Sequence, residues 1–393
     1  MNALKGRGTI LLLALAQATY ACSVLIVFSS ASLVGLTIAP FRSLATIPIT
    51  AFVVGSMLAT VPASMLMRKW GRKPVFLGGA ASAVVGSLIA TWAIFNSSFT
   101  GFCLGTLLQG VFQATSSFNS FAATEVARPE DKALSISWVL TGGVISAVAG
   151  AYIARHTAHL YEPYAFAGSY MAAAMLAMVA IGIILTMQLP MPKAAEISGP
   201  QRSWPELLRQ RKLVVAMAAA IVSYGLMSLM MTAAPVAMKD CGFTTDDGTF
   251  VIQWHVLGMF VPSFFTGFLI KRFGVNLVTS VGLGILIVAG VTALSGISFT
   301  HFTAALVLLG LGWNFGFIGG TTLLTECYTP SERSKVQGVN NFAISAIQSV
   351  ATLASGAMLT FLGWASVPLL VMPAALAMLA LISWGAARRV VTV

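Results

Sequence analysis

Twelve apolar runs, each long enough to cross a lipid bilayer as a helix, constrain this chain more than any other feature. They lie at about 9–36, 44–66, 74–97, 98–124, 133–155, 165–188, 213–238, 247–270, 275–297, 300–325, 336–361 and 364–387. Of the 393 residues, 58% are hydrophobic and only 8% are charged, and the mean hydropathy is +0.89. The sequence therefore predicts an all-α membrane protein with twelve transmembrane helices, and it excludes a soluble enzyme.

Basic residues set the expected orientation, because cytoplasmic loops carry an excess of lysine and arginine. Nineteen of the 22 fall on one side of the predicted spans, and Arg42, Arg155 and Lys239 fall on the other. Since the number of spans is even, we expect both termini in the cytoplasm. The excess of basic residues in cytoplasmic loops, where they can also attract anionic membrane lipids, accounts for the net charge of +11. The charge therefore indicates no nucleic-acid partner. The apolar run after Lys5 and Arg7 is too long for a cleaved signal peptide.

The sequence repeats at an offset of about 200 residues. Two loop sequences show the repeat: LMRKWG at 66–71 recurs as LIKRFG at 269–274, and Thr124-Glu125 recurs as Thr325-Glu326. Such a repeat is typical of transporters built from two similar helix bundles. We predict an N-terminal six-helix bundle at 1–188, a proline-rich cytoplasmic linker at 189–212, and a C-terminal six-helix bundle at 213–393.

The loop after the second run resembles a signature of the major facilitator superfamily, G-x-L-a-D-R-x-G-R-K. Residues 64–73, SMLMRKWGRK, match it at the leucine, at the first basic position and at the closing Gly-Arg-Lys. They depart from it at Ser64 and at Arg68, which stands where the family has aspartate. Together with the repeat, the resemblance covers essentially the whole chain. It implies alternating access with cytoplasmic gate loops that contain Arg68, Gly71, Arg72, Lys73, Lys271, Arg272 and Gly274.

Acidic residues are expected to stay out of the membrane interior. Glu125 and Glu326 fall at cytoplasmic helix ends, and the other nine acids fall in loops. Proton-coupled carriers commonly hold a carboxylate inside the bundle, so the driving force stays open here. His255 is the one ionisable side chain that we expect well inside the hydrocarbon zone.

His255 belongs to a pair of four-residue spacings on consecutive spans. Met227 and Met231 lie in the span 213–238, and His255 and Met259 lie in the next one. Residues four apart share a helix face, and antiparallel neighbouring spans bring the two pairs to matching depth. Three thioethers and one imidazole suit Cu(I) better than Mg²⁺ or Ca²⁺, which prefer oxygen ligands. The spacing thus predicts a copper path.

The alternative for such residues is structural. A membrane histidine can simply bond a neighbouring helix, and methionines fill irregular gaps in helix packing. Met171 and Met175 have the same spacing with no histidine partner on the next span. Gln113 and Asn314 are repeat equivalents at an offset of 201, and this symmetry favours a structural or gating role for them.

The methionine and histidine pairs also resemble those of the CcoA-type copper importers of bacteria. This resemblance implies import of copper, free or carried by a small ligand, across the bacterial inner membrane. It implies metal handling by Met227, Met231, His255 and Met259, with Cys241 and Met238 as candidates for a metal relay. A copper chaperone and, indirectly, haem-copper oxidase assembly are the implied partners, and no prosthetic group is expected.

Two other functions remain open. One is a facilitator for an organic solute such as riboflavin, with Tyr224, Trp254 and Trp313 lining a flavin-sized pocket. The other is a non-transporting assembly factor that binds copper and passes it to a partner. A multidrug exporter is disfavoured, because the antiporter signature with its Gly-Pro pair is absent from the fifth span.

Overall fold

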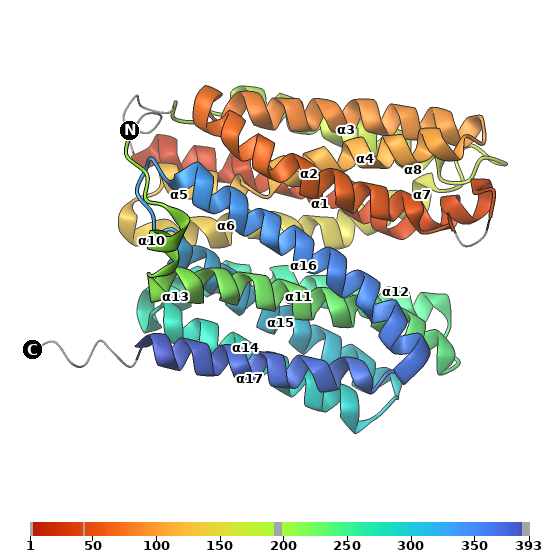
Figure 1. Cartoon of the computed structure of the whole chain (residues 1–393). Coiled ribbons are helices and arrows are strands. Elements are labelled where there is room, and N and C mark those ends of the chain that lie inside the picture. Colours follow the sequence, from red (N-terminus) through yellow and green to blue (C-terminus); the bar gives the residue numbers. More distant parts are fainter. Residues whose placement is uncertain (1–2, 42–43, 192–198, 387–393) are drawn as a thin grey trace, which may run out of the picture. The chain divides into compact units, whose positions relative to one another are not determined.

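The computed structural model describes residues 3–41, 44–191 and 199–386, and all regular structure in these ranges is helical (Figure 1). The first half holds α1 (Ala3–Ile38), α2 (Ile47–Trp70), α3 (Arg72–Phe95), α4 (Phe99–Ser116), α5 (Asn119–Val126), α6 (Lys132–Ile145), a π-helical segment (Ser146–Gly150), α7 (Ala151–Thr157) and α8 (Ala167–Thr186). The second half holds α10 (Trp204–Leu208), α11 (Arg211–Asp240), α12 (Thr245–Phe260), α13 (Ser263–Phe273), α14 (Val275–Ser295), α15 (Phe299–Leu324), α16 (Arg333–Leu362) and α17 (Ser366–Ala386). Part of the predicted linker, 192–198, lies outside the described residues.

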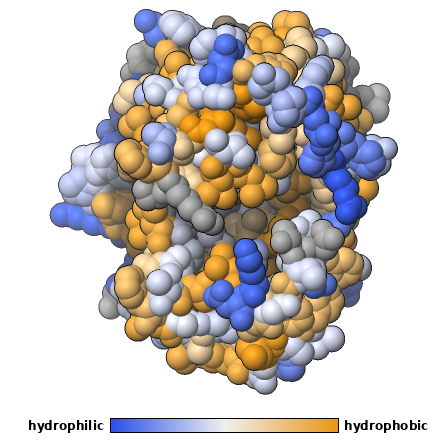
Figure 2. All heavy atoms as spheres, turned by 90° about the vertical axis from the view of Figure 1, so that its right-hand side faces the viewer, coloured by the Kyte–Doolittle hydropathy of each residue, from blue (hydrophilic) through white to orange (hydrophobic). Residues whose placement is uncertain are grey.

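Eleven helical segments of the described chain are long and apolar enough to cross a membrane. The remaining predicted span, 98–124, corresponds to α4 and α5, which together cover Phe99–Val126. Because α4 packs along α2 and α3, which are both candidate spans, it belongs to the same layer of helices. Figure 2, a view along the helices, shows a surface that is largely hydrophobic with separate hydrophilic patches. The prediction of an all-α membrane protein is confirmed.

Close contacts group the chain into two compact units. Unit 1 comprises Met1–Ala127, Trp138–Gly199 and Pro330–Ser345, and unit 2 comprises Arg128–Ser137, Pro200–Thr329 and Ala346–Val393. The sequence repeat divides the chain at the linker, whereas these units divide α6 and α16 as well. The first turns of α16 therefore belong to unit 1.

In unit 1, small residues let α4 approach its neighbours closely, as in other membrane bundles. A Cβ atom on Gly110 of α4 would lie 2.1 Å from the carbonyl oxygen of Phe52 on α2. A Cβ atom on Gly105 would lie 2.6 Å from the carbonyl oxygen of Gly86 on α3. Larger residues at these positions would force the helices apart.

In unit 2, α15 takes the place that α4 has in unit 1. It packs against α11, α12 and α14. A Cβ atom on Gly310 would lie 2.6 Å from the carbonyl oxygen of His255 on α12, and one on Gly320 would lie 2.8 Å from the amide nitrogen of Ala220 on α11. The repeat in the sequence is thus a repeat in helix packing.

Two glycines make the corresponding turns of the repeat. Gly71 joins α2 to α3 at φ 83°, and Gly274 joins α13 to α14 at φ 86°. The amide of Gly71 donates to the carbonyl of Met67 at 3.0 Å, and the amide of Gly274 donates to that of Ile270 at 2.9 Å. Since L-residues with a side chain rarely adopt this backbone conformation, both positions require glycine.

Candidate functional site

The four residues of the predicted copper path all lie within unit 2. Met227, His255 and Met259 are buried, and Met231 is half-buried. Met227 and Met231 lie on α11, whereas His255 and Met259 lie on α12 where it packs against Gly310 of α15. Among the described residues, no group of three or more histidine, cysteine, aspartate or glutamate side chains is arranged to hold a metal ion. Any metal bound here would depend on thioether sulfur.

The imidazole of His255 has one ring nitrogen engaged and one bare. Its side chain is fully buried, and Nδ1 lies 2.7 Å from the carbonyl oxygen of Leu306 on α15. A carbonyl only accepts, so Nδ1 carries the proton and donates. The other nitrogen, Nε2, is buried and has no hydrogen-bond partner in the described part of the chain. His255 therefore presents an unused lone pair inside unit 2.

The two candidate relay residues differ in exposure. Met238 is buried near the end of α11, and Cys241 caps that helix and is exposed. The amide of Cys241 donates to the carbonyl of Ala237 at 3.0 Å.

Four aromatic side chains of unit 2 form a cluster, which we call the aromatic cluster: Tyr224, Phe260, Trp313 and Phe317. Trp313 and Phe317, one turn apart on α15, stack with their centroids 5.0 Å apart and their planes 7° apart. Tyr224 of α11 and Phe260 of α12 meet Trp313 edge to face at 5.5 Å and 5.8 Å. Trp313 is buried and its indole N–H has no acceptor among the described residues, whereas the other three rings keep part of their surface uncovered.

The sequence placed Tyr224 and Trp313 together correctly, but Trp254 is not in the aromatic cluster. Trp254 is 46% exposed and pairs with Phe250, one turn away on the same helix. Phe260 and Phe317 were not predicted. Phe317 follows Trp313 by four residues, and this spacing was the signal available for it.

Asn314, next to Trp313 on α15, joins three segments of unit 2. Its Nδ2 donates to the carbonyl of Met259 and to the hydroxyl of Ser263, both at 2.6 Å, and its Oδ1 accepts from the hydroxyl of Thr266 at 2.6 Å. Pro262 has no N–H to donate to the preceding turn, so the helix is interrupted between α12 and α13. Asn314 stabilises this break from the side.

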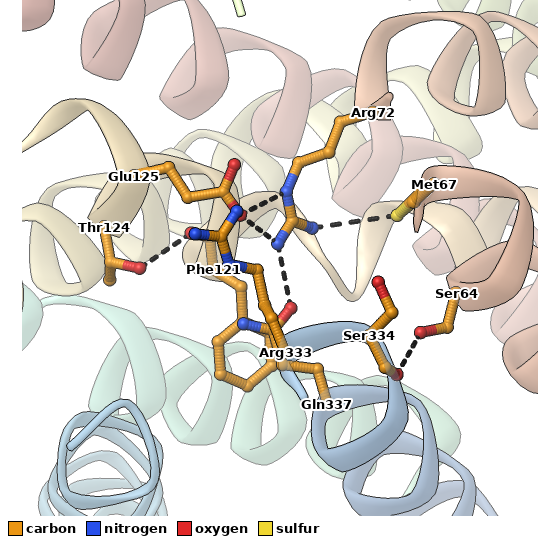
Figure 3. A network of polar contacts seen from close by, with 9 residues as sticks. All are labelled: Ser64, Met67, Arg72, Phe121, Thr124, Glu125, Arg333, Ser334 and Gln337. Carbon is orange, nitrogen blue, oxygen red and sulfur yellow. Dashed lines mark hydrogen bonds and ion pairs between the residues drawn. The ribbon is translucent and has the colours of Figure 1, made fainter. Parts of the chain in front are cut away.

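A charge network in unit 1 joins the loop after α2 to the start of α16 (Figure 3). Arg72 contacts Oε1 of Glu125 through Nη2 at 2.5 Å and through Nε at 2.8 Å, and Nη1 of Arg333 lies 3.1 Å from the same oxygen. Arg72 also donates to Gln337 at 2.8 Å, and Ser64 donates to the carbonyl of Ser334. The first turn of α16 is thereby tied to α2, α3 and α5.

The expectation that no acid is convincingly buried is wrong for Glu332, which is 1% exposed, and for Glu125. The side chain of Glu125 is only 9% exposed. Its partners are 53 and 208 residues away in the sequence, so the ion pairs that allow its burial could not be seen locally.

A cavity of about 250 Å³ adjoins this network. Its lining includes Arg68, Gly71, Arg72, Glu125 and Arg333. Arg68, which stands where the signature quoted above has aspartate, therefore adds positive charge beside the network instead of balancing it.

The remaining residues of the predicted gate loops bond within their own units. In unit 1, Lys73 donates to the carbonyls of Leu185 at 2.6 Å and Met187 at 3.0 Å. In unit 2, Lys271 pairs with Asp131 at 2.8 Å, and Arg272 lies over the ring of Phe273 at 5.3 Å.

Comparisons with known proteins agree with this architecture. The family described as Major Facilitator Superfamily matches residues 11–261 and 216–391. The riboflavin transporter RfnT of Brucella anthropi is 39% identical over 376 residues, which cover 95% of this chain and 94% of RfnT. YddS of Bacillus subtilis, an uncharacterised MFS-type transporter, is 26% identical over 76% of this chain and 72% of its own.

Solved structures share the fold at low sequence identity. The proton:xylose symporter XylE superposes with a TM-score of 0.78 at 11% identity, covering 97% of each chain. The MFS transporter FucP, in its outward conformation, gives 0.76 at 15% identity, covering 96% of this chain and 98% of its own.

Proposed function

The chain belongs to the major facilitator superfamily, and we propose that this secondary transporter carries a flavin-like organic solute such as riboflavin. The aromatic cluster is the observation that supports this proposal most. The tricyclic ring of a flavin is planar and apolar on its faces, so it stacks on aromatic side chains, and its polar edge can accept from the indole N–H of Trp313. The 39% identity to a riboflavin transporter along almost the whole chain supports the same solute.

Alternating access across a bacterial inner membrane, with both termini in the cytoplasm, completes the proposal. In this orientation the charge network of Arg72, Glu125 and Arg333 lies at the cytoplasmic end, and releasing it frees the first turn of α16 from α2, α3 and α5.

Uptake of radiolabelled riboflavin by cells that express variants of Trp313 tests the proposal. Trp313→Phe keeps a stacked ring and loses the N–H, so we expect a partial loss. Trp313→Ala should reduce uptake at least about tenfold, the equivalent of about 1.4 kcal/mol. Trp254→Ala removes an exposed tryptophan outside the aromatic cluster and serves as the control. Wild-type uptake by Trp313→Ala at normal abundance would rule out the aromatic cluster as the solute site.

Copper is the second candidate, because Nε2 of His255 is a bare lone pair in a unit that also buries Met227 and Met259. The same nitrogen can instead accept a hydrogen bond from an organic solute. Methionine-to-leucine changes separate the two functions, since they keep the side-chain volume and remove only sulfur. If the protein carries copper, Met227→Leu should abolish copper uptake. If it carries riboflavin, the same change should alter riboflavin uptake by no more than about twofold.

A further inference from the structure

Two glutamines on α4 of unit 1 have buried polar atoms that bond nothing in the described part of the chain. Gln109 is 3% exposed, and neither its Oε1 nor its Nε2 has a hydrogen-bond partner. Gln113 is 9% exposed, and its Oε1 also lacks a partner. Leaving a buried amide unpaired is costly, so a residue whose only role was structural would be expected to find a partner.

The repeat supplies a comparison for Gln113. Its equivalent in the second half, Asn314, makes three short hydrogen bonds to α12 and α13. Asn314 therefore has the interhelical role that membrane amides usually have. Gln113 stands at the matching position without such bonds from its oxygen, so that role does not account for it.

The geometry of α4 places both glutamines on one face of the helix. Gln109, Gln113 and Ser117 follow at four-residue spacing. Leu104, nine residues before Gln113, is 50% exposed and lies about two and a half turns away, on the opposite side of the helix. The hydroxyl of Ser117 accepts from Nδ2 of Asn341 at 2.9 Å. On this face, Ser117 thus has a hydrogen-bond partner, whereas buried polar atoms of Gln113 and Gln109, on the two preceding turns, have none.

We propose that Gln109 and Gln113 form a polar subsite that binds the hydrogen-bonding edge of the transported solute. This inference rests on the proposed function. The amide of Gln109 presents a donor and an acceptor side by side, which matches the adjacent carbonyl and N–H of a cyclic imide such as the pyrimidine-type ring of riboflavin. The oxygen of Gln113 accepts from a second donor, a hydroxyl of the ribityl chain.

A bound cation does not satisfy the same atoms. Amide oxygens suit hard cations, and these would leave the N–H groups of Gln109 without an acceptor. Cu(I) prefers soft sulfur and imidazole ligands, which neither glutamine offers. A ligand that both donates and accepts hydrogen bonds fits this unpaired set of one donor group and two acceptors better than a cation does.

Competition between riboflavin and 3-methylriboflavin, which lacks only the imide N–H, tests the subsite in proteoliposomes. The wild type should prefer riboflavin by a factor of about ten. Gln109→Leu and the closer isostere Gln109→Met should transport riboflavin more weakly and should show a preference of no more than about twofold. Gln17→Leu is the matched control, because Gln17 is also a buried glutamine of unit 1 but is bonded by Asn119 at 3.0 Å. It should keep the tenfold preference.

The outcomes separate the subsite from the proposed function. A wild-type preference retained by both Gln109 variants overturns the subsite and leaves flavin transport standing. Wild-type protein that takes up no riboflavin overturns the proposed function and this subsite with it. Loss of preference in Gln17→Leu as well would show that any perturbation of the bundle erases discrimination, and it would also overturn the assignment.

Discussion

At the scale of single residues, equivalent glutamates in the two halves of the repeat have different surroundings. Glu125 is buried between Arg72 and Arg333, whereas its equivalent Glu326 is 43% exposed and pairs with Lys212 at 2.5 Å. A buried carboxylate between two cations balances charge that has lost its water, but an exposed pair adds little. The network around Glu125 is therefore expected to contribute to stability, and the one around Glu326 is not.

Glu125→Gln should destabilise the protein by about 3 kcal/mol, because it leaves Arg72 and Arg333 without their shared carboxylate. Glu326→Gln should cost less than about 1 kcal/mol. Thermal unfolding of both purified variants in detergent measures the difference. Equal shifts in the two variants would contradict a special role for the buried network.

Asn314 and Gln113 give a second matched pair. Asn314→Ala removes three hydrogen bonds and leaves the polar groups of Met259 and Ser263 unpaired, so we expect a loss of about 1–3 kcal/mol. Gln113→Ala removes an oxygen that has no partner, so it should cost clearly less. Thermal melts compare the two variants, and a larger loss in Gln113→Ala would mean that Gln113 is a structural residue.

At the scale of helices and turns, hydropathy predicted where the helices lie because an apolar run in a membrane must satisfy its backbone internally. The same signal says nothing about breaks inside a run. The π-helical segment after α6 and the interruption at Pro262 appear only in the structure. Gln113 of α4 was expected to have a structural or gating role, and the unpaired atoms of Gln109 and Gln113 could not be read from the sequence.

The turn at Gly274 tests how far backbone conformation fixes an element boundary. Gly274 has φ 86° and open space around its Cα, so Gly274→Ala meets no steric neighbour and only strains the backbone, by about 1–3 kcal/mol. Gly284 also faces open space but lies inside α14, where alanine favours the helix by up to about 1 kcal/mol. Thermal melts should therefore move in opposite directions, and a stabilised Gly274→Ala would refute the turn assignment.

At the scale of the whole molecule, composition and the repeat were enough to predict the fold, since lipid admits few architectures, and the signature-like loop at 64–73 was needed to predict the family. The solute was not predictable in this way. The four-residue spacing of methionine and histidine led to copper as the first hypothesis, whereas the aromatic cluster and the riboflavin transporter relative support a flavin. Spacing along one helix does not reveal which side chains from other helices complete a site.

Orientation in the membrane is testable through Cys241. With Cys22, Cys103 and Cys327 changed to serine, an impermeant maleimide should label Cys241 in intact cells, because this exposed thiol is expected on the outer side. Burial raises the pKa of the Cys327 thiol to about 11, so even without the serine change it should react slowly. Arg209→Cys, in a variant with Cys241 also removed, should be labelled only after permeabilisation. The reverse pattern would invert the proposed topology.

Riboflavin uptake by the purified protein in proteoliposomes tests the central claim most directly. The account predicts saturable entry of radiolabelled riboflavin, at least about tenfold weaker with Trp313→Ala and changed by no more than about twofold with Met227→Leu. The same vesicles loaded with a Cu(I) chelator provide the copper arm. Copper uptake that depends on Met227 and His255, with no riboflavin entry above that of empty vesicles, would contradict the account.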